Sequence, residues 1–299
     1  MTETTTSLRR KIDSAGDLHS VVRTMKAMAA SNMGQYEQSV RALADYYRSV
    51  ELGLSICFRE SAPPALMFKG NAEAGSVGAV VFGSDQGLVG QFNDVVSDFA
   101  LNALAGMSGS TRIWAVGERV QAHLVDSGLP MPGLFAVPNS VQAITPLVGQ
   151  ILLETETHDS HGEINELYLF YNRPTSGAVF QPVKQRLLPL DTAWRRELAE
   201  ITWPTQSLPE VIGGETASNA RSITLRALIR EYLFVSLFRA CAESLASENA
   251  SRLAAMQRAD KNINELLDDL NGTFQRLRKS SIDEELFDVI AGFEALTRP

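Results

Sequence analysis

Residues 8–54 read LRRKIDSAGDLHSVVRTMKAMAASNMGQYEQSVRALADYYRSVELGL. The apolar residues of this stretch recur every seven positions in two interleaved rows, and the second row is interrupted only by His19 and Lys26. The rows are Leu8, Ala15, Val22, Ala29, Tyr36, Leu43 and Val50, and then Ile12, His19, Lys26, Met33, Val40, Tyr47 and Leu54. A period near 3.5 residues keeps one stripe of a helix against a partner helix, so this pattern predicts a coiled coil.

A second heptad pattern runs from Thr216 to Ala295. One of its rows is Leu228, Val235, Ala242, Asn249, Met256, Ile263, Leu270 and Leu277, and the other contains Tyr232, Leu245, Leu253, Leu266, Leu267 and Phe274. Unbroken helices of these lengths would measure roughly 80 Å and 120 Å at ~1.5 Å per residue. We expect the two terminal helices to pair with each other antiparallel, as a long stalk.

The prolines divide the chain into three segments. All twelve lie in the middle of the sequence except the last residue, and proline disrupts the interior of a helix. We therefore expect an N-terminal coiled-coil helix in residues 1–62, an α/β domain in residues 63–209, and a C-terminal coiled-coil helix in residues 210–299.

The middle segment alternates strand-like and helix-like stretches. The expected strands are Val77–Phe82, Arg112–Val116, Leu134–Val137, Glu166–Tyr171 and Val179–Leu188, and the expected helices are Asn93–Leu104, 118–127 and Ala143–Glu154. Strands that alternate with helices favour a small parallel sheet, here closed by a hairpin of the last two strands. The predicted fold class is α/β plus long helices.

Composition excludes several classes of protein. The 299 residues carry a formal net charge of −8, which argues against a nucleic-acid binder. The two cysteines form no CxxC motif, so neither a disulfide framework nor a zinc finger is expected. No apolar run approaches the ~18 residues of a membrane helix, and the first residues lack the apolar core of a signal peptide. We expect a soluble, intracellular protein.

Two features of the middle segment are compatible either with a binding site or with a purely structural role. The glycine-rich loop Gly83–Gly90 follows a strand, as a phosphate-binding loop does, but it lacks the lysine of a P-loop. A structural turn with Ser84 or Asp85 as a helix cap is favoured. His158 and His161 lie in a polar stretch, which favours a solvated loop over a metal site. We expect no catalytic, cofactor-binding or metal-binding residues.

Four segments, taken in order, resemble the gamma subunit of F-type ATP synthases. They are LRRKI with TMKAMAASNM (residues 8–12 and 24–33), SDQGLVGQFN (84–93), SENASRLAAM (247–256) and RKSSIDEEL (278–286). The family's corresponding motifs are IRxRI with TKAMxMVAASKM, SDRGLCGxxN, SExxARMxAM and ARQxxITxEL. The segments span both ends and the centre, so the resemblance covers the whole chain.

The resemblance implies a function that spacing does not reveal. Such a subunit is the central rotor shaft, an antiparallel coiled coil beside a Rossmann-like α/β domain. It stands inside a ring of alternating alpha and beta subunits and sits with epsilon on the membrane ring of c subunits, so that it couples ion flow to ATP synthesis or hydrolysis. It has no catalytic residues or cofactor of its own. The implied location is the cytoplasmic side of a bacterial inner membrane, as a peripheral protein.

Five residues are implied to contact the beta subunit. Met25 matches the first methionine of the family's AMxM patch, and Lys26 would add a cation that faces acidic side chains. Arg252 matches the arginine of SExxARM. Lys279 replaces a glutamine of the family and Asp283 a threonine, at two positions that contact beta in relatives, so those contacts would be rebuilt or lost.

Further departures indicate a divergent branch of the family, such as the alternative F-type ATPases of some bacteria. Gln86 and Val89 replace an arginine and a cysteine of the central motif.

Two other functions are kept as alternatives. One is a standalone α/β enzyme that dimerises through its helical arms, and the other is a coiled-coil scaffold or tether with no rotary role.

Overall fold

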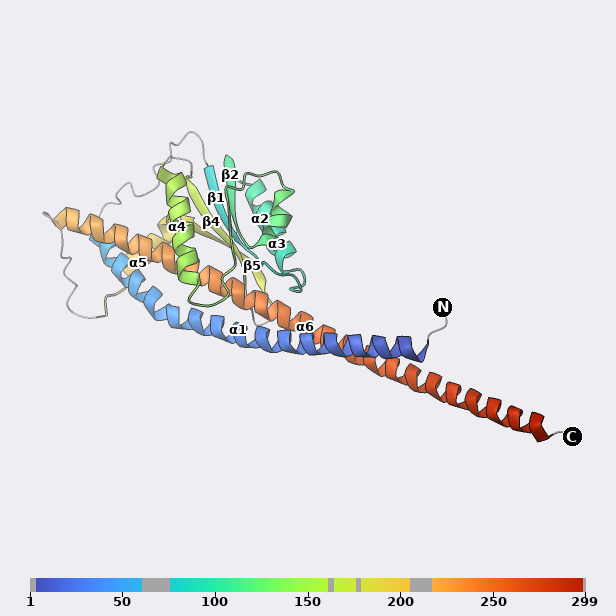
Figure 1. Cartoon of the computed structure of the whole chain (residues 1–299). Coiled ribbons are helices and arrows are strands. Elements are labelled where there is room, and N and C mark those ends of the chain that lie inside the picture. Colours follow the sequence, from blue (N-terminus) through green and yellow to red (C-terminus); the bar gives the residue numbers. More distant parts are fainter. Residues whose placement is uncertain (1–3, 61–75, 161–163, 176–178, 205–216, 298–299) are drawn as a thin grey trace. The chain divides into compact units, whose positions relative to one another are not determined.

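The structure is a computed structural model that describes residues 4–60, 76–160, 164–175, 179–204 and 217–297 (Figure 1). The chain forms two compact units. The first unit consists of Met1–Ala29 and Arg252–Pro299, and the second is Ala30–Ser251. Each unit contains its own cluster of packed apolar side chains.

Two long helices carry the heptad patterns, as predicted. Helix α1 spans Thr5–Glu60 and α6 spans Ala217–Thr297. All members of the first row of α1 are buried except Leu43, which is half-buried. One residue expected in the seam, which is the apolar interface between α1 and α6, is not there. The side chain of Leu266 is 50% exposed, and its neighbour Leu267 packs against the apolar cluster of Val22, Met256 and Ile263.

Within the second unit the two helices pair antiparallel. Tyr46 near the middle of α1 donates a hydrogen bond of 2.6 Å to Glu231, and the rings of Tyr47 and Tyr232 lie 6.2 Å apart. Gly53, further along α1, lies against Leu228, which is earlier in α6. The contacts thus move backward along α6 as they move forward along α1, as predicted.

The α/β domain has one five-stranded sheet with the strand order β3-β2-β1-β4-β5. Its strands are β1 (Ser76–Phe82), β2 (Ser110–Val116), β3 (Gly133–Phe135), β4 (Glu166–Arg173) and β5 (Gln181–Leu188). The first four are parallel to their neighbours, and β5 pairs antiparallel with β4. The predicted parallel sheet closed by a hairpin is therefore confirmed.

Helices cover both faces of the sheet. Helices α2 (Phe92–Ala105) and α3 (Glu118–Val125) pack on the face that carries Val77, Ala79 and Val81. The opposite face, with Val80 and Phe82, packs against α4 (Ile144–Ser160) and parts of α1 and α6. Because successive residues of a strand point to opposite faces, the continuous apolar run of β1 is buried on both sides.

The structure adds one helix to those predicted. Helix α5 covers Thr192–Glu200, and Asp191 caps it by accepting a 2.9 Å hydrogen bond from the backbone N–H of Ala193. Nine residues give a weak periodic signal, because they offer only two turns and a half. Helix α4 also continues to Ser160, past the predicted end at Glu154.

The glycine-rich loop is held by side chains of the domain itself. The carboxylate of Asp85 accepts a 3.0 Å hydrogen bond from the N–H of Glu118 and a 2.9 Å bond from the N–H of Val137. Asp85 thus caps α3, which lies far along the chain, whereas the residue before α2, Gln91, makes no side-chain cap. The expected turn is present, but the cap belongs to a different helix.

Candidate functional site

All five residues expected to contact a partner lie in the first unit. Met25 is half-buried and packs against a small apolar cluster formed by Val22 of α1 with Met256 and Ile263 of α6. Part of its side chain therefore belongs to the seam between the two helices. The remainder reaches the surface, where it is available to a partner.

Lys26 is held by an acid of its own chain. Its Nζ lies 2.9 Å from Oδ2 of Asp260, and Nε2 of His19 lies 2.8 Å from Oδ1 of the same carboxylate. The Lys26 hydrogen bond, followed by that of His19, holds the pKa of Asp260 below its usual value. The three side chains form a polar bridge between α1 and α6, so one part of the hydrogen-bonding capacity of Lys26 is already used.

The sequence contains one signal for this bridge. His19 and Lys26 are the two interruptions of the second heptad row, and they are one heptad apart. Polar residues in a seam are stabilised when a partner on the facing helix satisfies them. Asp260 is that partner, and only the pairing of the helices reveals it.

The bridge predicts a loss of stability in acid. Asp260 has a lowered pKa when folded, so its contacts contribute fully above the ordinary value of 3.8 and are lost as pH falls through the lower, folded value. We expect the wild type to lose more thermal stability between about pH 5 and about pH 2 than Asp260→Asn, which carries no charge there. Circular dichroism melting curves of both proteins measure this difference. Parallel pH profiles would contradict the bridge.

The other three predicted residues lie on α6. Arg252 is half-buried at the start of the α6 segment in this unit. Lys279 and Asp283 are exposed and four residues apart, so they share one face of the helix. The structure thus leaves both side chains accessible. Their contact with a partner stays a prediction.

The most prominent surface feature of the first unit was not singled out from the sequence. Near its C-terminal end, α6 exposes a row of large apolar side chains that are 46–69% accessible. They are Ile282, Leu286, Phe287, Val289, Ile290 and Phe293. Five of the six are spaced so that they share one helix face. We call these six residues the apolar end. A surface of this kind indicates a binding site for another protein.

A metal-binding cluster or a cavity lined by reactive side chains would indicate an enzyme. The described residues contain no group of three His, Cys, Asp or Glu side chains that could hold a metal ion. A cavity of about 540 Å³ is lined by residues that include Tyr47, Arg48, Glu51 and Thr202, and burial raises the pKa of Glu51. The described lining residues of this cavity include no histidine, cysteine or serine. They supply no recognisable acid–base pair.

The histidine pair and the expected lack of a membrane-spanning helix remain to be compared with the structure. The expected loop is wrong for His158, which lies in the last turn of α4, because the helix continues to Ser160. His161 lies outside the described residues, so the metal interpretation of the pair is not tested. Among the described residues, no helix combines the length and the hydropathy needed to cross a bilayer.

Comparison with known proteins gives one consistent family. A family model described as ATP synthase matches residues 4–296. The ATP synthase gamma chain of Glaesserella parasuis serovar 5 (strain SH0165) is 26% identical over 293 residues, which cover 97% of this chain and 98% of the relative. That of Sorangium cellulosum (strain So ce56) is 27% identical over 321 residues, with the same coverage.

Solved structures share the fold. A chain of the rotor of the Euglena gracilis mitochondrial ATP synthase, in rotational state 1, aligns with a TM-score of 0.60 at 17% identity and covers 93% of this chain and 98% of that one. A chain from the OSCP/F1/c-ring part of the same complex, in rotational state 3, aligns with a TM-score of 0.64 at 18% identity, covering 98% and 94%. Because the family model matches nearly the whole chain, the chain belongs to the family of ATP synthase gamma chains.

Proposed function

We propose that this chain is the central rotor shaft of an F-type ATP synthase, and that it couples ion flow through a membrane ring of c subunits to ATP synthesis or hydrolysis. The observation that carries the proposal is the family match over residues 4–296, which includes both long helices and the α/β domain. Its partners are the alpha and beta subunits of the catalytic hexamer, the epsilon subunit and the c-ring.

The first unit has the surface that such a shaft requires. The apolar end of α6 exposes large apolar side chains along one helix face, and an apolar surface gains free energy when a partner covers it. A smooth apolar contact also suits rotation, because it has few directional hydrogen bonds that must break at each step. We infer that this end lies within the ring of alpha and beta subunits.

The mechanism is mechanical coupling. Each catalytic site meets a different face of the shaft, because a two-helix coil has no threefold symmetry. A face that contacts one conformation of a site better than another shifts the equilibrium of that site by the difference in contact free energy. Rotation then drives the three sites through different affinities in turn.

The contacts with beta are proposed residue by residue. Met25, Lys26, Arg252, Lys279 and Asp283 are accessible at least in part. Lys26 is shared with Asp260, but an ammonium group has three donors, so it can also meet an acidic side chain of beta. Lys279 and Asp283 offer opposite charges to beta, where relatives offer neutral side chains.

We further propose that the subunit has no catalytic role of its own and is a peripheral protein on the cytoplasmic side of a bacterial inner membrane. The first part is supported by the family match over residues 4–296. The second part is supported by the bacterial sources of the gamma chains that it resembles.

Native mass spectrometry of the tagged chain, purified gently from membranes of its host, tests the proposal. We expect one copy of this chain with three copies each of two nucleotide-binding subunits. A symmetric homodimer or a free monomer, under conditions that keep such complexes intact, would contradict the rotor and favour the enzyme or the scaffold. A complex with another stoichiometry would favour the scaffold.

A further inference from the structure

In the second unit, α6 occupies the place where related α/β sheets bind ligands. In the strand order β3-β2-β1-β4-β5, the chain passes from β1 to β2 on one side and later returns to β4 on the other. Open α/β sheets bind their ligands at such a switch point, beyond the carboxyl ends of the two strands. In this chain, side chains of α6 bind the end of β4 and the loop that follows β1.

Three residues of α6, spaced four apart, make these contacts. Glu243 binds Arg173 at the end of β4, and Ser251 donates a 2.5 Å hydrogen bond to the carbonyl of Val89, in the loop after β1. The hydroxyl of Ser247 lies 3.0 Å from the carbonyl of Asn172 and 2.9 Å from the carbonyl of Glu243 in its own helix, so its one proton is shared between the two acceptors. Residues at this spacing lie on one face of a helix. We call Glu243, Ser247 and Ser251 the sheet-facing row.

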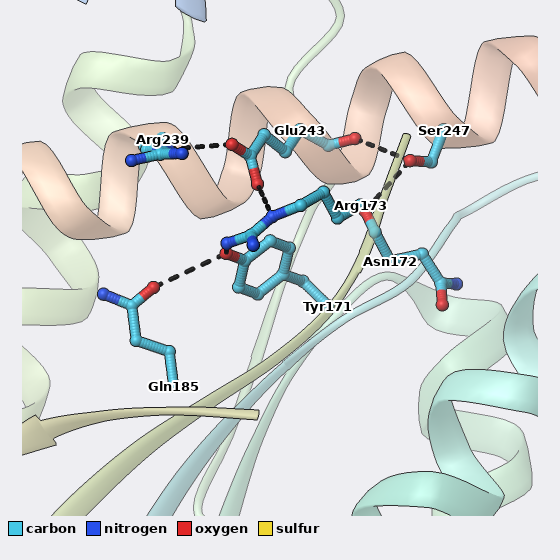
Figure 2. Close-up of polar contacts among 7 residues, drawn as sticks. All are labelled: Tyr171, Asn172, Arg173, Gln185, Arg239, Glu243 and Ser247. Atoms are coloured by element: carbon cyan, nitrogen blue, oxygen red, sulfur yellow. Dashed lines mark hydrogen bonds and ion pairs between the residues drawn. The ribbon is translucent and has the colours of Figure 1, made fainter. Parts of the chain in front are cut away.

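The contact of Glu243 is an ion pair in which the acid is buried and the side chain of Arg173 is 36% exposed. The side chain of Glu243 is 7% exposed, and its Oε2 lies 2.7 Å from Nε of Arg173. The guanidinium of Arg173 also donates a 2.5 Å hydrogen bond to the hydroxyl of Tyr171, whose pKa burial raises to about 12. Figure 2 shows this chain of contacts, which continues from Tyr171 to Gln185 of β5 at 3.5 Å. The pair therefore connects α6 to two strands of the sheet.

A second arginine binds the same carboxylate, but its ion pair lies within α6, and its charge reaches the sheet only through space, where it acts to lower the pKa of Tyr171. Nε of Arg239 lies 2.8 Å from Oε1 of Glu243, and both residues belong to α6 (Figure 2). The two ion pairs have nearly equal length and involve the same acid. They differ in that Arg173 joins the helix to the sheet, whereas Arg239 joins the helix to itself.

We propose that the sheet-facing row is a coupling contact, with the Glu243–Arg173 pair as its main element, that makes the α/β domain and α6 turn as one body. In this arrangement α6 takes the place of a ligand at the switch point. Glu243 and Arg173 are positioning residues, because they act through the helix and not on nucleotide. The inference rests on the proposed rotor function.

The experiment compares Arg173→Met with Arg239→Met in the assembled complex in membrane vesicles. Each substitution removes one cation from Glu243 and keeps the apolar length of the side chain. Loss of a charge-assisted hydrogen bond shifts a two-state equilibrium by about tenfold. We expect Arg173→Met to lower the ratio of ATP-driven ion transport to ATP hydrolysis about threefold or more, with hydrolysis retained. Arg239→Met leaves the ratio at the wild-type value.

Conservative variants separate coupling from folding. Arg173→Lys keeps the charge and is expected to restore most of the ratio, while Ser247→Ala removes one hydrogen bond to the sheet and lowers the ratio moderately. If Arg173→Met fails to assemble, Ser247→Ala decides the question, since it keeps both arginines of Glu243 and removes only a contact with the sheet. Native mass spectrometry confirms equal stoichiometry for every variant that is compared.

Two outcomes would overturn the inference. Equal effects of Arg173→Met and Arg239→Met would mean that Glu243 needs only charge compensation, and an unchanged ratio in Arg173→Met and Ser247→Ala would mean that the row does not couple. Failure of the rotor function itself gives a different result. In that case the wild-type complex shows no ATP-driven ion transport at all.

Discussion

Replacing Ile263 with aspartate is expected to separate the two helices of the first unit. Its side chain is 7% exposed and packs with Val22 and Met256. The substitution removes a buried branched side chain and places a carboxylate among apolar groups, which together cost about 3–5 kcal/mol. In the free chain, amide hydrogen exchange of the α6 segment measures the loss of protection. In the complex, we expect ATP hydrolysis to continue with much less ion transport.

Leu266→Asp is the matched control for this prediction. It introduces the same side chain three residues further along the same helix, but Leu266 is 50% exposed. Surface substitutions of this kind change stability by only about 0.5 kcal/mol. We therefore expect wild-type protection in the free chain. Equal destabilisation by the two variants would contradict the seam assigned here.

The second large effect is expected at the apolar end of α6. Replacing Leu286 and Ile290 together with aspartate changes exposed side chains, so the melting temperature of the free chain should stay within a few degrees of the wild type. If this surface is covered by the hexamer, two carboxylates become buried without partners, and each costs several kcal/mol. We expect at least a tenfold loss of assembled complex, measured by the yield of co-purified alpha and beta subunits.

Glu285→Gln controls for changes of charge in the same turns of α6. Glu285 is also exposed, and its substitution leaves the apolar side chains in place. We expect a normal yield of complex with this variant. A normal yield with the double aspartate variant would show that the apolar end is not covered by the hexamer, and a strongly reduced yield with Glu285→Gln would show that charge decides assembly.

The elements with long or strongly patterned sequences were predictable. The heptads of α1 and α6 and the apolar run of β1 gave their bounds to within a few residues, because burial on one stripe or on both faces leaves a periodic or continuous apolar signal. Helix α5 was missed because it is short. The three-segment division at residues 62 and 209 stays a prediction.

The candidate site was less predictable than the fold. The five proposed contact residues came from the resemblance to a family, and the spacing of residues gave no hint of their role. The apolar end has an apolar spacing of its own and does not continue the row of Leu277, whose next two positions are Glu284 and Ala291. Spacing alone did not tell whether these side chains pack against a facing helix or stay exposed. Leu266 shows the same difficulty, because it and Leu267 are equally apolar and only one of them packs inward.

The long helices, the alternating α/β segment and the family follow from the amino-acid sequence alone, since they depend on local periodicity and on ordered motifs. The tertiary structure alone decided which polar groups meet. Asp260 lies more than 230 residues from its two partners in α1, and Glu243 lies 70 residues from Arg173. The physical reason is that an ion pair or a hydrogen bond depends on distance in space, and a single polar residue has no periodicity that would announce its partner.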